Sequence, residues 1–298
     1  MRRGNRYAFP LAFFCLLMGA CGHFGSTSNA PSARPSAIAL SVSSRAVYLV
    51  DPTSGQRRTL AGHLSDFQGG YATWGPDRME LAYGDDGIIL LNPMTNRVRP
   101  LVHGRSISMP AISPDGRTLV YGDGISLWTT NLANIRPHRF RIPAILAPLE
   151  MAWGSDGLIA LEGLRLDCSK IVRCTSTGFS EIWTILPDGT GLTQVTKLGH
   201  AEKPKWSPDG RSILFVRSYP GTKKPDELWV TQADGSSTHR MLGSGVVAAD
   251  WSPDGSRLAL VKPGSKSNTL QMYVGRSDGS RLKPLGKPVK GTDATIDW

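Results

Sequence analysis

The chain has 298 residues, of which 34 are lysine or arginine and 24 are acidic, so its formal net charge is +10. A basic balance of this size suits a protein that docks on anionic surfaces or polymers. Nucleic acid is excluded from the expected partners, because the first residues of the chain predict export from the cytoplasm.

Residues 1–20 have the pattern of a secretion signal. Arg2, Arg3 and Arg6 form a basic region, and an apolar run follows at residues 8–18. This run is too short to span a bilayer as a helix of the mature protein. Twin-arginine export is a weaker alternative, because the residues that flank the arginine pair do not fit that signal. Removal of the segment would leave 31 basic and 24 acidic residues, a net charge of +7.

The signal ends in Leu17-Met18-Gly19-Ala20-Cys21, which resembles a bacterial lipobox. In a lipobox, small residues precede a cysteine that is lipidated and becomes the new N-terminus. Met18 departs from the pattern, which usually has leucine or another aliphatic residue at that place. We expect Cys21 to bear a lipid that anchors the protein to a membrane. The alternative is an ordinary signal peptide next to a chance cysteine.

Residues 21–36 are predicted to be a flexible tether. The segment is rich in Gly, Ser, Pro, Ala and Asn and has almost nothing to bury, so it should not fold by itself. Fifteen such residues span roughly 20 Å on average. The domain at residues 37–298 would then lie just off a membrane surface, outside the cytoplasm.

A five-residue turn motif recurs along this domain. In Trp251-Ser252-Pro253-Asp254-Gly255, proline presets φ at the first corner of a hairpin turn and glycine takes the left-handed position. The other copies are Trp74-Gly75-Pro76-Asp77-Arg78, Ile112-Ser113-Pro114-Asp115-Gly116, Trp153-Gly154-Ser155-Asp156-Gly157 and Trp206-Ser207-Pro208-Asp209-Gly210. The steps from each copy to the next, and then to Trp298, are 38, 41, 53, 45 and 47 residues. Such periods, with four strand-sized runs per unit, are typical of propeller blades.

Each unit is expected to form strands A to D, counted outward from the axis. Strand A bears the tryptophan and strand B follows the turn. The predicted B strands are residues 37–43, 79–83, 118–121, 158–161, 212–216 and 257–261. Strand C has an aromatic residue in five blades: Tyr48, Trp128, Trp183, Trp229 and Tyr273. In the C-to-D turn at residues 92–96, Asn96 is predicted to take the left-handed position.

The first unit lacks an inner strand, and the end of the chain supplies one. Ala294-Thr295-Ile296-Asp297-Trp298 matches Ala248-Ala249-Asp250-Trp251 and stops where a turn should follow. We therefore predict an all-β fold, a six-bladed β-propeller of four-stranded antiparallel blades, closed by pairing of the C-terminal strand with the first blade. Closure removes the exposed sheet edges of an open array.

The repeat, W-S-P-D-G followed by a short apolar strand, resembles that of the TolB-type, WD40-like propellers over residues 38–298. The resemblance implies the fold more than a function, since such propellers serve as scaffolds, as enzymes and as accessory domains of peptidases. TolB itself has an α/β domain before its propeller and binds a peptidoglycan-associated lipoprotein. This chain has only a tether there, so the resemblance does not transfer that role.

Cys168 and Cys174 are expected to form a disulfide. The other two cysteines lie in the signal and at the lipidation site, and this pair falls in the blade whose spacing is stretched to 53 residues. The bond would staple a protruding loop between a strand ending near residue 161 and one beginning near residue 181, contributing about 2 kcal/mol. Outside the cytoplasm a disulfide is the default. The alternative, half of a metal site, lacks partner ligands.

All eleven lysines lie at or after residue 170. In the blade scheme, the A-to-B and C-to-D turns emerge on one face of the disc, and the B-to-C and D-to-A loops emerge on the other. Eight lysines are assigned to loops of the second kind: Lys170, Lys203, Lys223, Lys224, Lys262, Lys266, Lys287 and Lys290. They either keep these loops soluble or form an electrostatic docking face.

The sequence offers little for catalysis. The serines and aspartates of the turns are fixed by turn geometry, and no Gly-x-Ser-x-Gly elbow follows. His63, His103 and His200 fall in D-to-A loops but have no His-x-His or His-Glu-x-x-His spacing. Asp250 and Asp297, each just before a strand-A tryptophan, either point into the central channel or bond to neighbouring backbone. The tryptophans are assigned to blade packing, and no cofactor is expected.

The sequence thus predicts a non-catalytic, membrane-anchored binding scaffold of the cell envelope. We expect a monomer that engages a protein or an anionic envelope polymer through the lysine-bearing loops. The alternative is a channel-mouth hydrolase, lyase or lactonase that uses one of the three histidines with a metal.

Overall fold

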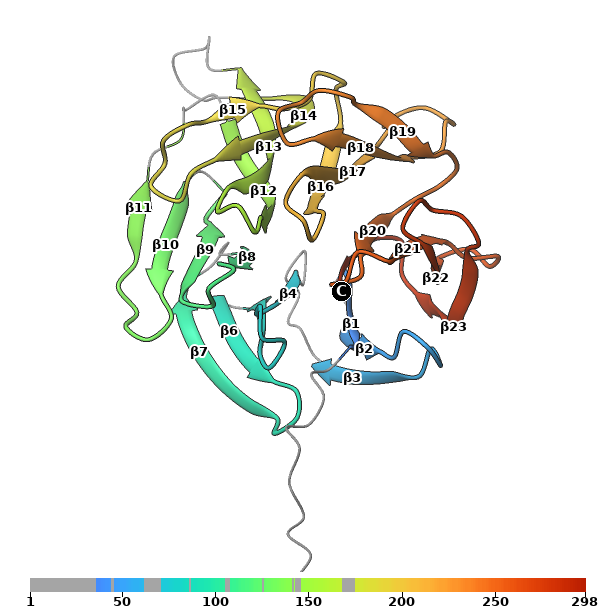
Figure 1. Cartoon of the computed structure of the whole chain (residues 1–298), viewed down its shortest axis with the longest axis horizontal. Coiled ribbons are helices and arrows are strands. Elements are labelled where there is room, and N and C mark those ends of the chain that lie inside the picture. The colour runs from blue at the N-terminus through green and yellow to red at the C-terminus, as the bar shows by residue number, and fades with distance from the viewer. Residues whose placement is uncertain are drawn as a thin grey trace, which may run out of the picture. The chain divides into compact units, whose positions relative to one another are not determined.

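A computed structural model describes residues 36–43, 46–61, 71–85, 87–104, 108–124, 126–140, 142, 146–167 and 175–298. These residues form 24 strands in six four-stranded sheets and no helix. The sheets are arranged as blades around a central channel (Figure 1), which confirms the predicted six-bladed propeller. Within the described part of the chain, no helix is long and apolar enough to cross a membrane.

The blades run outward from the inner strand in the following order. Blade one has β24 (Ala294–Asp297), β1 (Ile38–Val42), β2 (Ala46–Val50) and β3 (Arg57–Ala61). Blade two has β4 (Ala72–Trp74), β5 (Leu81–Asp85), β6 (Gly87–Asn92) and β7 (Arg97–His103). Blade three has β8 (Ser108–Ile112), β9 (Thr118–Gly122), β10 (Leu127–Asn131) and β11 (His138–Phe140).

The second half of the chain repeats the arrangement. Blade four has β12 (Leu146–Trp153), β13 (Ile159–Asp167), β14 (Thr175–Ile185) and β15 (Thr193–Gln194). Blade five has β16 (Ala201–Trp206), β17 (Ser212–Arg217), β18 (Glu227–Gln232) and β19 (His239–Leu242). Blade six has β20 (Ala248–Trp251), β21 (Arg257–Pro263), β22 (Thr269–Arg276) and β23 (Lys283–Lys290).

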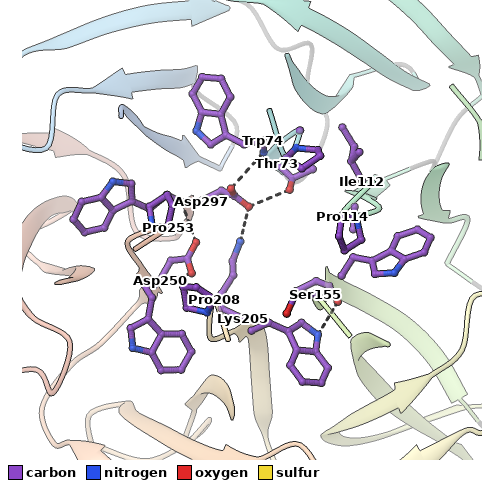
Figure 2. Close-up of a pocket in the computed structure, with 18 of the residues that line it drawn as sticks. Thr73, Trp74, Ile112, Pro114, Ser155, Lys205, Pro208, Asp250, Pro253 and Asp297 are labelled. Atoms are coloured by element: carbon purple, nitrogen blue, oxygen red, sulfur yellow. Dashed lines mark hydrogen bonds and ion pairs between the residues drawn. The ribbon is translucent and has the colours of Figure 1, made fainter. Parts of the chain in front are cut away.

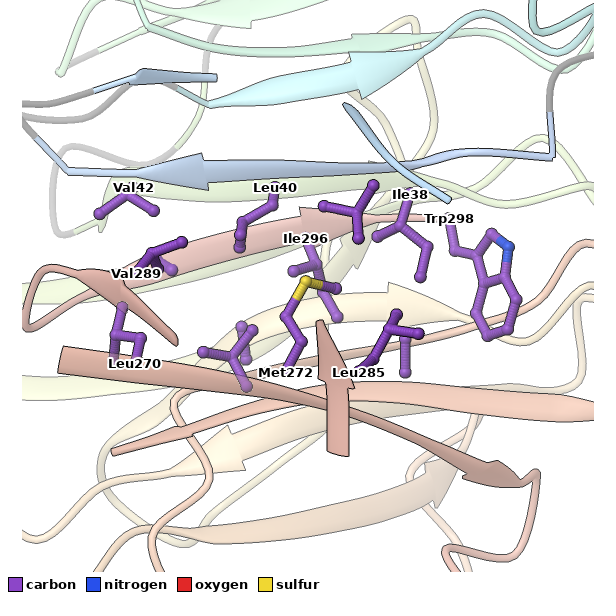
Figure 3. Close-up of a cluster of buried hydrophobic side chains, with 14 residues drawn as sticks. Ile38, Leu40, Val42, Leu270, Met272, Leu285, Val289, Ile296 and Trp298 are labelled. Atoms are coloured by element: carbon purple, nitrogen blue, oxygen red, sulfur yellow. The ribbon is translucent and has the colours of Figure 1, made fainter. Parts of the chain in front are cut away.

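The C-terminal strand closes the ring, as predicted. β24 pairs antiparallel with β1, from Ala39 opposite Asp297 to Val42 opposite Ala294. The indole Nε1 of Trp298 donates to the carbonyl oxygen of Ser36 at 3.1 Å. Figure 3 shows Trp298 and Ile296 in one buried cluster with side chains of blades one and six.

The hydrophobic core is divided into six clusters, each shared by two neighbouring blades. Between blades five and six, for example, Val216 and Leu228 pack with Trp251 and Leu260. Strand B of a blade is covered on both faces, so all five residues of β1 are buried. This explains why the B strands are continuous apolar runs rather than alternating ones.

The repeated turns have the predicted geometry. The Ser252 hydroxyl donates to the Asp254 carboxylate, and the amide of Gly255 donates to the Ser252 carbonyl oxygen at 2.8 Å. Gly255 has φ of 69°, in the left-handed region. Where the motif has no glycine, Arg78 takes this conformation with φ of 59°, and Asn96 does so with φ of 55°, as predicted for Asn96.

The protruding loop predicted for blade four is largely a hairpin, so that prediction is wrong. β13 continues to Asp167 and β14 begins at Thr175, with Leu164 opposite Ser180. The reason is a second strand pattern in the insertion, because Leu164 and Leu166 alternate with Gly163 and Arg165, a period of two. Cys168 and Cys174 lie outside the described residues.

Candidate functional site

The A-to-B turns surround the mouth of the central channel (Figure 2). A cavity of about 350 Å³ opens there. Its wall consists of the strand-A tryptophans, the prolines of four turns and a few polar side chains. The polar side chains in the wall include Thr73, Arg78, Lys205, Asp250 and Asp297. The cavity is therefore lined by both charged side chains and the tryptophans of the inner strands.

Lys205 reaches from blade five to the closing strand across this cavity (Figure 2). Its Nζ lies 3.0 Å from Oδ2 of Asp297, and the two side chains are only 16% and 17% exposed. Asp297 also accepts the Thr73 hydroxyl at 3.0 Å and the Trp74 amide at 3.3 Å. Burial disfavours the Lys205 charge, but Asp297 and Asp250 outweigh it and raise the lysine pKa. Asp297 thus joins blades one, two and five.

Asp250 is buried next to this pair and accepts the amides of Trp251 at 2.8 Å and Trp298 at 2.9 Å. Burial raises the Asp250 pKa to about 7, although Lys205 opposes the shift. The two roles predicted as alternatives for Asp250 and Asp297, lining the channel and bonding to backbone, are therefore both present. The two carboxylates line the channel and also bond to neighbouring backbone.

A second ion pair lies two residues earlier in β16. The Nζ of Lys203 pairs with Asp293 and also donates to the carbonyl oxygens of Val247 and Ala294, each at 3.1 Å. The Lys203 side chain is 13% exposed. Its assignment to an exposed loop is therefore wrong. A register shift between Glu202 and Lys205, with Lys203 at φ of 56°, turns this side chain inward.

Two buried glutamates flank Lys203. Glu162 accepts the Lys203 amide at 3.2 Å. Burial raises the Glu150 pKa to about 7 against the attraction of Lys203 and Lys205. Burial and then the Glu150 charge raise the Glu162 pKa. Glu150 in turn, together with burial, raises the pKa of Tyr71, which hydrogen bonds to it. These residues form a buried group of acids and lysines, which the sequence did not predict.

The histidines do not assemble a metal site among the described residues, which contain no group of three His, Cys, Asp or Glu able to hold an ion. His103 is exposed at the end of β7. His200 lies in the β15–β16 connection, and its ring is 5.2 Å from that of Phe179. His63 lies outside the described residues.

The other lysines of the predicted docking set remain near the surface. Lys223 and Lys224 are exposed in the β17–β18 loop, and Lys266 is exposed in the β21–β22 loop. Three lie in strands rather than loops, which corrects their placement: Lys262 in β21, and Lys287 and Lys290 in β23. We call the six residues Lys223, Lys224, Lys262, Lys266, Lys287 and Lys290 the lysine face. Lys170 lies outside the described residues.

Blade five organises one edge of the lysine face around Glu227, which is buried. This carboxylate accepts the Tyr219 hydroxyl at 2.6 Å, the Trp229 Nε1 at 3.0 Å and an Arg240 nitrogen at 3.1 Å. Burial would raise the Glu227 pKa, but these hydrogen bonds and Lys224 lower it to about 2. The Lys224 Nζ lies 3.7 Å from the centre of the Tyr219 ring. Glu227 therefore fixes an aromatic and cationic surface.

Comparison with solved structures finds proteins of similar fold. TolB from Acinetobacter baumannii matches with a TM-score of 0.69 at 15% identity, over 88% of this chain and 66% of that one. A putative TolB from Agrobacterium tumefaciens gives 0.61 at 19% identity, over 86% and 89%. An oligogalacturonate lyase in complex with manganese gives 0.56 at 17% identity, over 81% and 72%. No family model and no curated protein matches the sequence.

At these identities the likeness concerns the fold. The chain is a six-bladed β-propeller, and the propellers that it resembles include the TolB type. This agrees with the family resemblance of the turn motif. The chain spans 66% of the length of the Acinetobacter protein.

Proposed function

We propose that the protein is a non-catalytic binding scaffold of the cell envelope, held at a membrane by a lipid on Cys21. It engages a protein or an anionic envelope polymer through the lysine face. The observation on which the proposal depends is the contrast between two sets of lysines. Lys203 and Lys205 are largely buried and pair with Asp293 and Asp297, whereas most lysines of the lysine face are exposed to solvent.

Lys203 and Lys205 form ion pairs within the protein, so their charges are already compensated. Lys203 pairs with Asp293, the residue just before β24, and Lys205 pairs with Asp297, the last residue of β24. Both ion pairs therefore help to hold the closing strand in the ring. Among the described residues, neither Lys223 nor Lys266 has an acidic partner within 4.0 Å. Exposed cations without acidic partners attract an anionic surface and steer its approach.

The likeness to TolB propellers supports a scaffold. The likeness to a lyase that binds manganese favours the second candidate, a metal-dependent enzyme at the channel mouth. Such an enzyme would need His63, which lies outside the described residues, or a set completed by a ligand, because His103 and His200 do not form a metal group by themselves.

A pull-down from solubilised membranes separates these functions. The test variant combines Lys223→Glu, Lys262→Glu and Lys266→Glu. It leaves Lys224 unchanged, because its Nζ lies 3.4 Å from Oε1 of Glu227. The matched control is Lys283→Glu, an exposed lysine at the first residue of β23, next to a C-to-D turn on the opposite face. We expect the triple variant to lose partners that the wild type and the control retain. Identical partner lists would refute docking through this face, and activity that a chelator abolishes would favour the enzyme.

A further inference from the structure

The outer edge of blade two exposes two large apolar side chains. Met94, in the β6–β7 turn, is 63% exposed, and Val98, in β7, is 50% exposed. β7 is the outermost strand of its blade (Figure 1), so both residues lie on the rim of the propeller. Apolar side chains that gather on a surface beside charged ones are typical of a contact with a partner or a membrane.

Arginines surround this part of the rim. The outer turns and strands of blades one to three, residues 51–61, 92–103 and 131–140, contain six arginines and one aspartate, a net charge of +5 with histidine neutral. The corresponding residues of blades four and five, 186–194 and 232–242, contain one arginine and two aspartates, a net charge of −1. The rim is therefore strongly polarised between these two sides of the ring.

The neighbouring segments do not reverse this charge. The inner turns of blades two and three, residues 75–80 and 113–117, contain three acidic and two basic residues, a net charge of −1. In blade six, which adjoins blade one, residues 276–290 contain five basic residues and one aspartate. The surface on either side of blade two thus remains positive.

Several of these guanidinium groups are held in place by neutral acceptors. Arg58 of β3 donates to the carbonyl oxygen of Pro93 in the β6–β7 turn. Arg99 of β7 donates to the carbonyl oxygen of Leu132 in the β10–β11 turn at 3.0 Å. Because a carbonyl oxygen has no net charge, these bonds fix the guanidinium groups across the blade junctions and leave their positive charge uncancelled. A guanidinium has five N–H donors, so further donors can bind a ligand.

The apolar side chains lie between arginines of two blades. Val98 is opposite Leu91, which packs in the cluster shared with blade one, the blade from which Arg58 extends. Successive side chains of a strand point to opposite faces, so Arg97 and Arg99 lie on the other side of β7. Arg97 is exposed and, among the described residues, has no acidic partner within 4.0 Å.

We propose that the outer edge of blade two docks on an anionic bilayer, with Met94 and Val98 at the level of the lipid headgroups and the arginines on lipid phosphates. Arginine matches a phosphate with two parallel hydrogen bonds, and basic residues near an anionic membrane surface add to binding. A soluble polyanion would satisfy the arginines but would leave the two apolar side chains in water.

This contact goes beyond the lysine face and does not depend on a lipid at Cys21. It sets the disc edge-on to the bilayer, because the contact is on the rim rather than on a face. Blade five, which carries Lys223 and Lys224, is opposite blade two in the ring (Figure 1). The lysine face therefore stays accessible to a partner that is not the docking membrane.

The test measures quenching of a tryptophan at residue 94 by brominated lipid. Full-length Met94→Trp is mixed with brominated vesicles of phosphatidylcholine alone, or of phosphatidylcholine with phosphatidylglycerol, and the wild-type fluorescence is subtracted. The matched control is Leu186→Trp, at a side chain 39% exposed in the corresponding turn of blade four. A lipid on Cys21 would tether every variant to both kinds of vesicle alike, so the difference between the vesicles reports the docking edge.

The charge requirement is tested within the Met94→Trp protein. Arg97→Glu is the test variant, and Arg211→Glu, at an exposed arginine in the β16–β17 turn of blade five, is its matched control. Thermal unfolding of each variant checks that the fold is kept. Binding of soluble dextran sulfate to the same proteins gives the comparison with a polyanion that has no bilayer.

We expect anionic vesicles to quench the tryptophan at residue 94 and neutral vesicles to leave it unquenched. Arg97→Glu should raise the lipid concentration for half-maximal quenching at least about tenfold, whereas Arg211→Glu should leave it unchanged, and Leu186→Trp should not be quenched. Equal quenching by both kinds of vesicle, or an Arg97→Glu variant as responsive as its parent, would overturn the proposal. Dextran sulfate binding that depends on Arg97, without quenching by anionic vesicles, would show a site for a soluble polyanion instead.

Discussion

Lys205 and Asp297, 92 residues apart in the chain, form an ion pair of 3.0 Å across the central channel. The lysine comes from blade five, and the aspartate comes from the strand that closes blade one. Both side chains are more than four-fifths buried. The ion pair therefore links blade five to the closing strand of blade one, and its loss should lower the free energy of unfolding.

Removing either partner should destabilise the protein by about 3 kcal/mol, because an uncompensated charge remains in a buried site. The variants are Lys205→Met and Asp297→Asn, measured by urea unfolding. The double variant should be less destabilised than the sum of the two, since it leaves no lone charge. Additive losses, or losses below about 0.5 kcal/mol, would show that the pair contributes nothing specific.

The stability of the protein should fall as the pH rises from about 5 to about 7.5. Glu150 and Asp250 each have a pKa raised to about 7 by burial, against the pull of nearby lysines. A carboxyl with a higher pKa in the folded chain than in the unfolded chain stabilises fully below its unfolded pKa. That contribution is lost as the pH rises through its folded pKa, by up to about 1.4 kcal/mol per pH unit for each group.

Urea unfolding at a series of pH values checks this slope. Glu150→Gln and Asp250→Asn keep an acceptor oxygen but cannot titrate, so each should flatten the fall. A stability that rises with pH across the same window, with equal slopes in wild type and variants, would mean that the two carboxyls do not titrate as described.

Deleting the closing strand should lower the stability of the protein far more than trimming a chain terminus normally does. Deletion of residues 294–298 removes Trp298, which is 5% exposed and typically costs about 3 to 5 kcal/mol on truncation to alanine. It also removes Asp297 and reopens the edge of β1. Differential scanning calorimetry should show a large drop in Tm, or no folded protein. A truncated chain that melts within about two degrees of the full chain would contradict closure.

Much of this architecture was predictable, because short stretches of sequence determine the turns and strands of each blade. The turn Ser252-Pro253-Asp254-Gly255 specifies its own hydrogen bonds, and the match between the two ends of the domain predicts closure. The ion pair of Lys205 and Asp297 was not predictable, because these residues lie 92 positions apart and become neighbours only when the ring forms. Lys203 turns inward through an irregularity in β16, which no residue pattern marks. Charged residues within a predicted inner strand, such as Glu202 and Lys205, were the available signal.

The lipid anchor is predicted from sequence alone. Mass spectrometry of the mature protein from the membrane fraction should find a diacylated Cys21 at the N-terminus. Cys21→Ser should leave an uncleaved or unlipidated form, without a diacylated N-terminus. Soluble wild-type protein with another N-terminus would show an ordinary signal peptide.

The central claim is that the channel charges hold the ring together while the lysine face holds the partner. The most direct test is the retention of membrane partners by immobilised protein as salt is raised, because exposed charges are screened over about 8 Å at physiological ionic strength and more strongly above it. We expect the wild type to release its partners steeply with salt. The Lys223→Glu, Lys262→Glu, Lys266→Glu variant should retain none while melting like the wild type. Salt-independent retention of the same partners by both proteins would contradict the account.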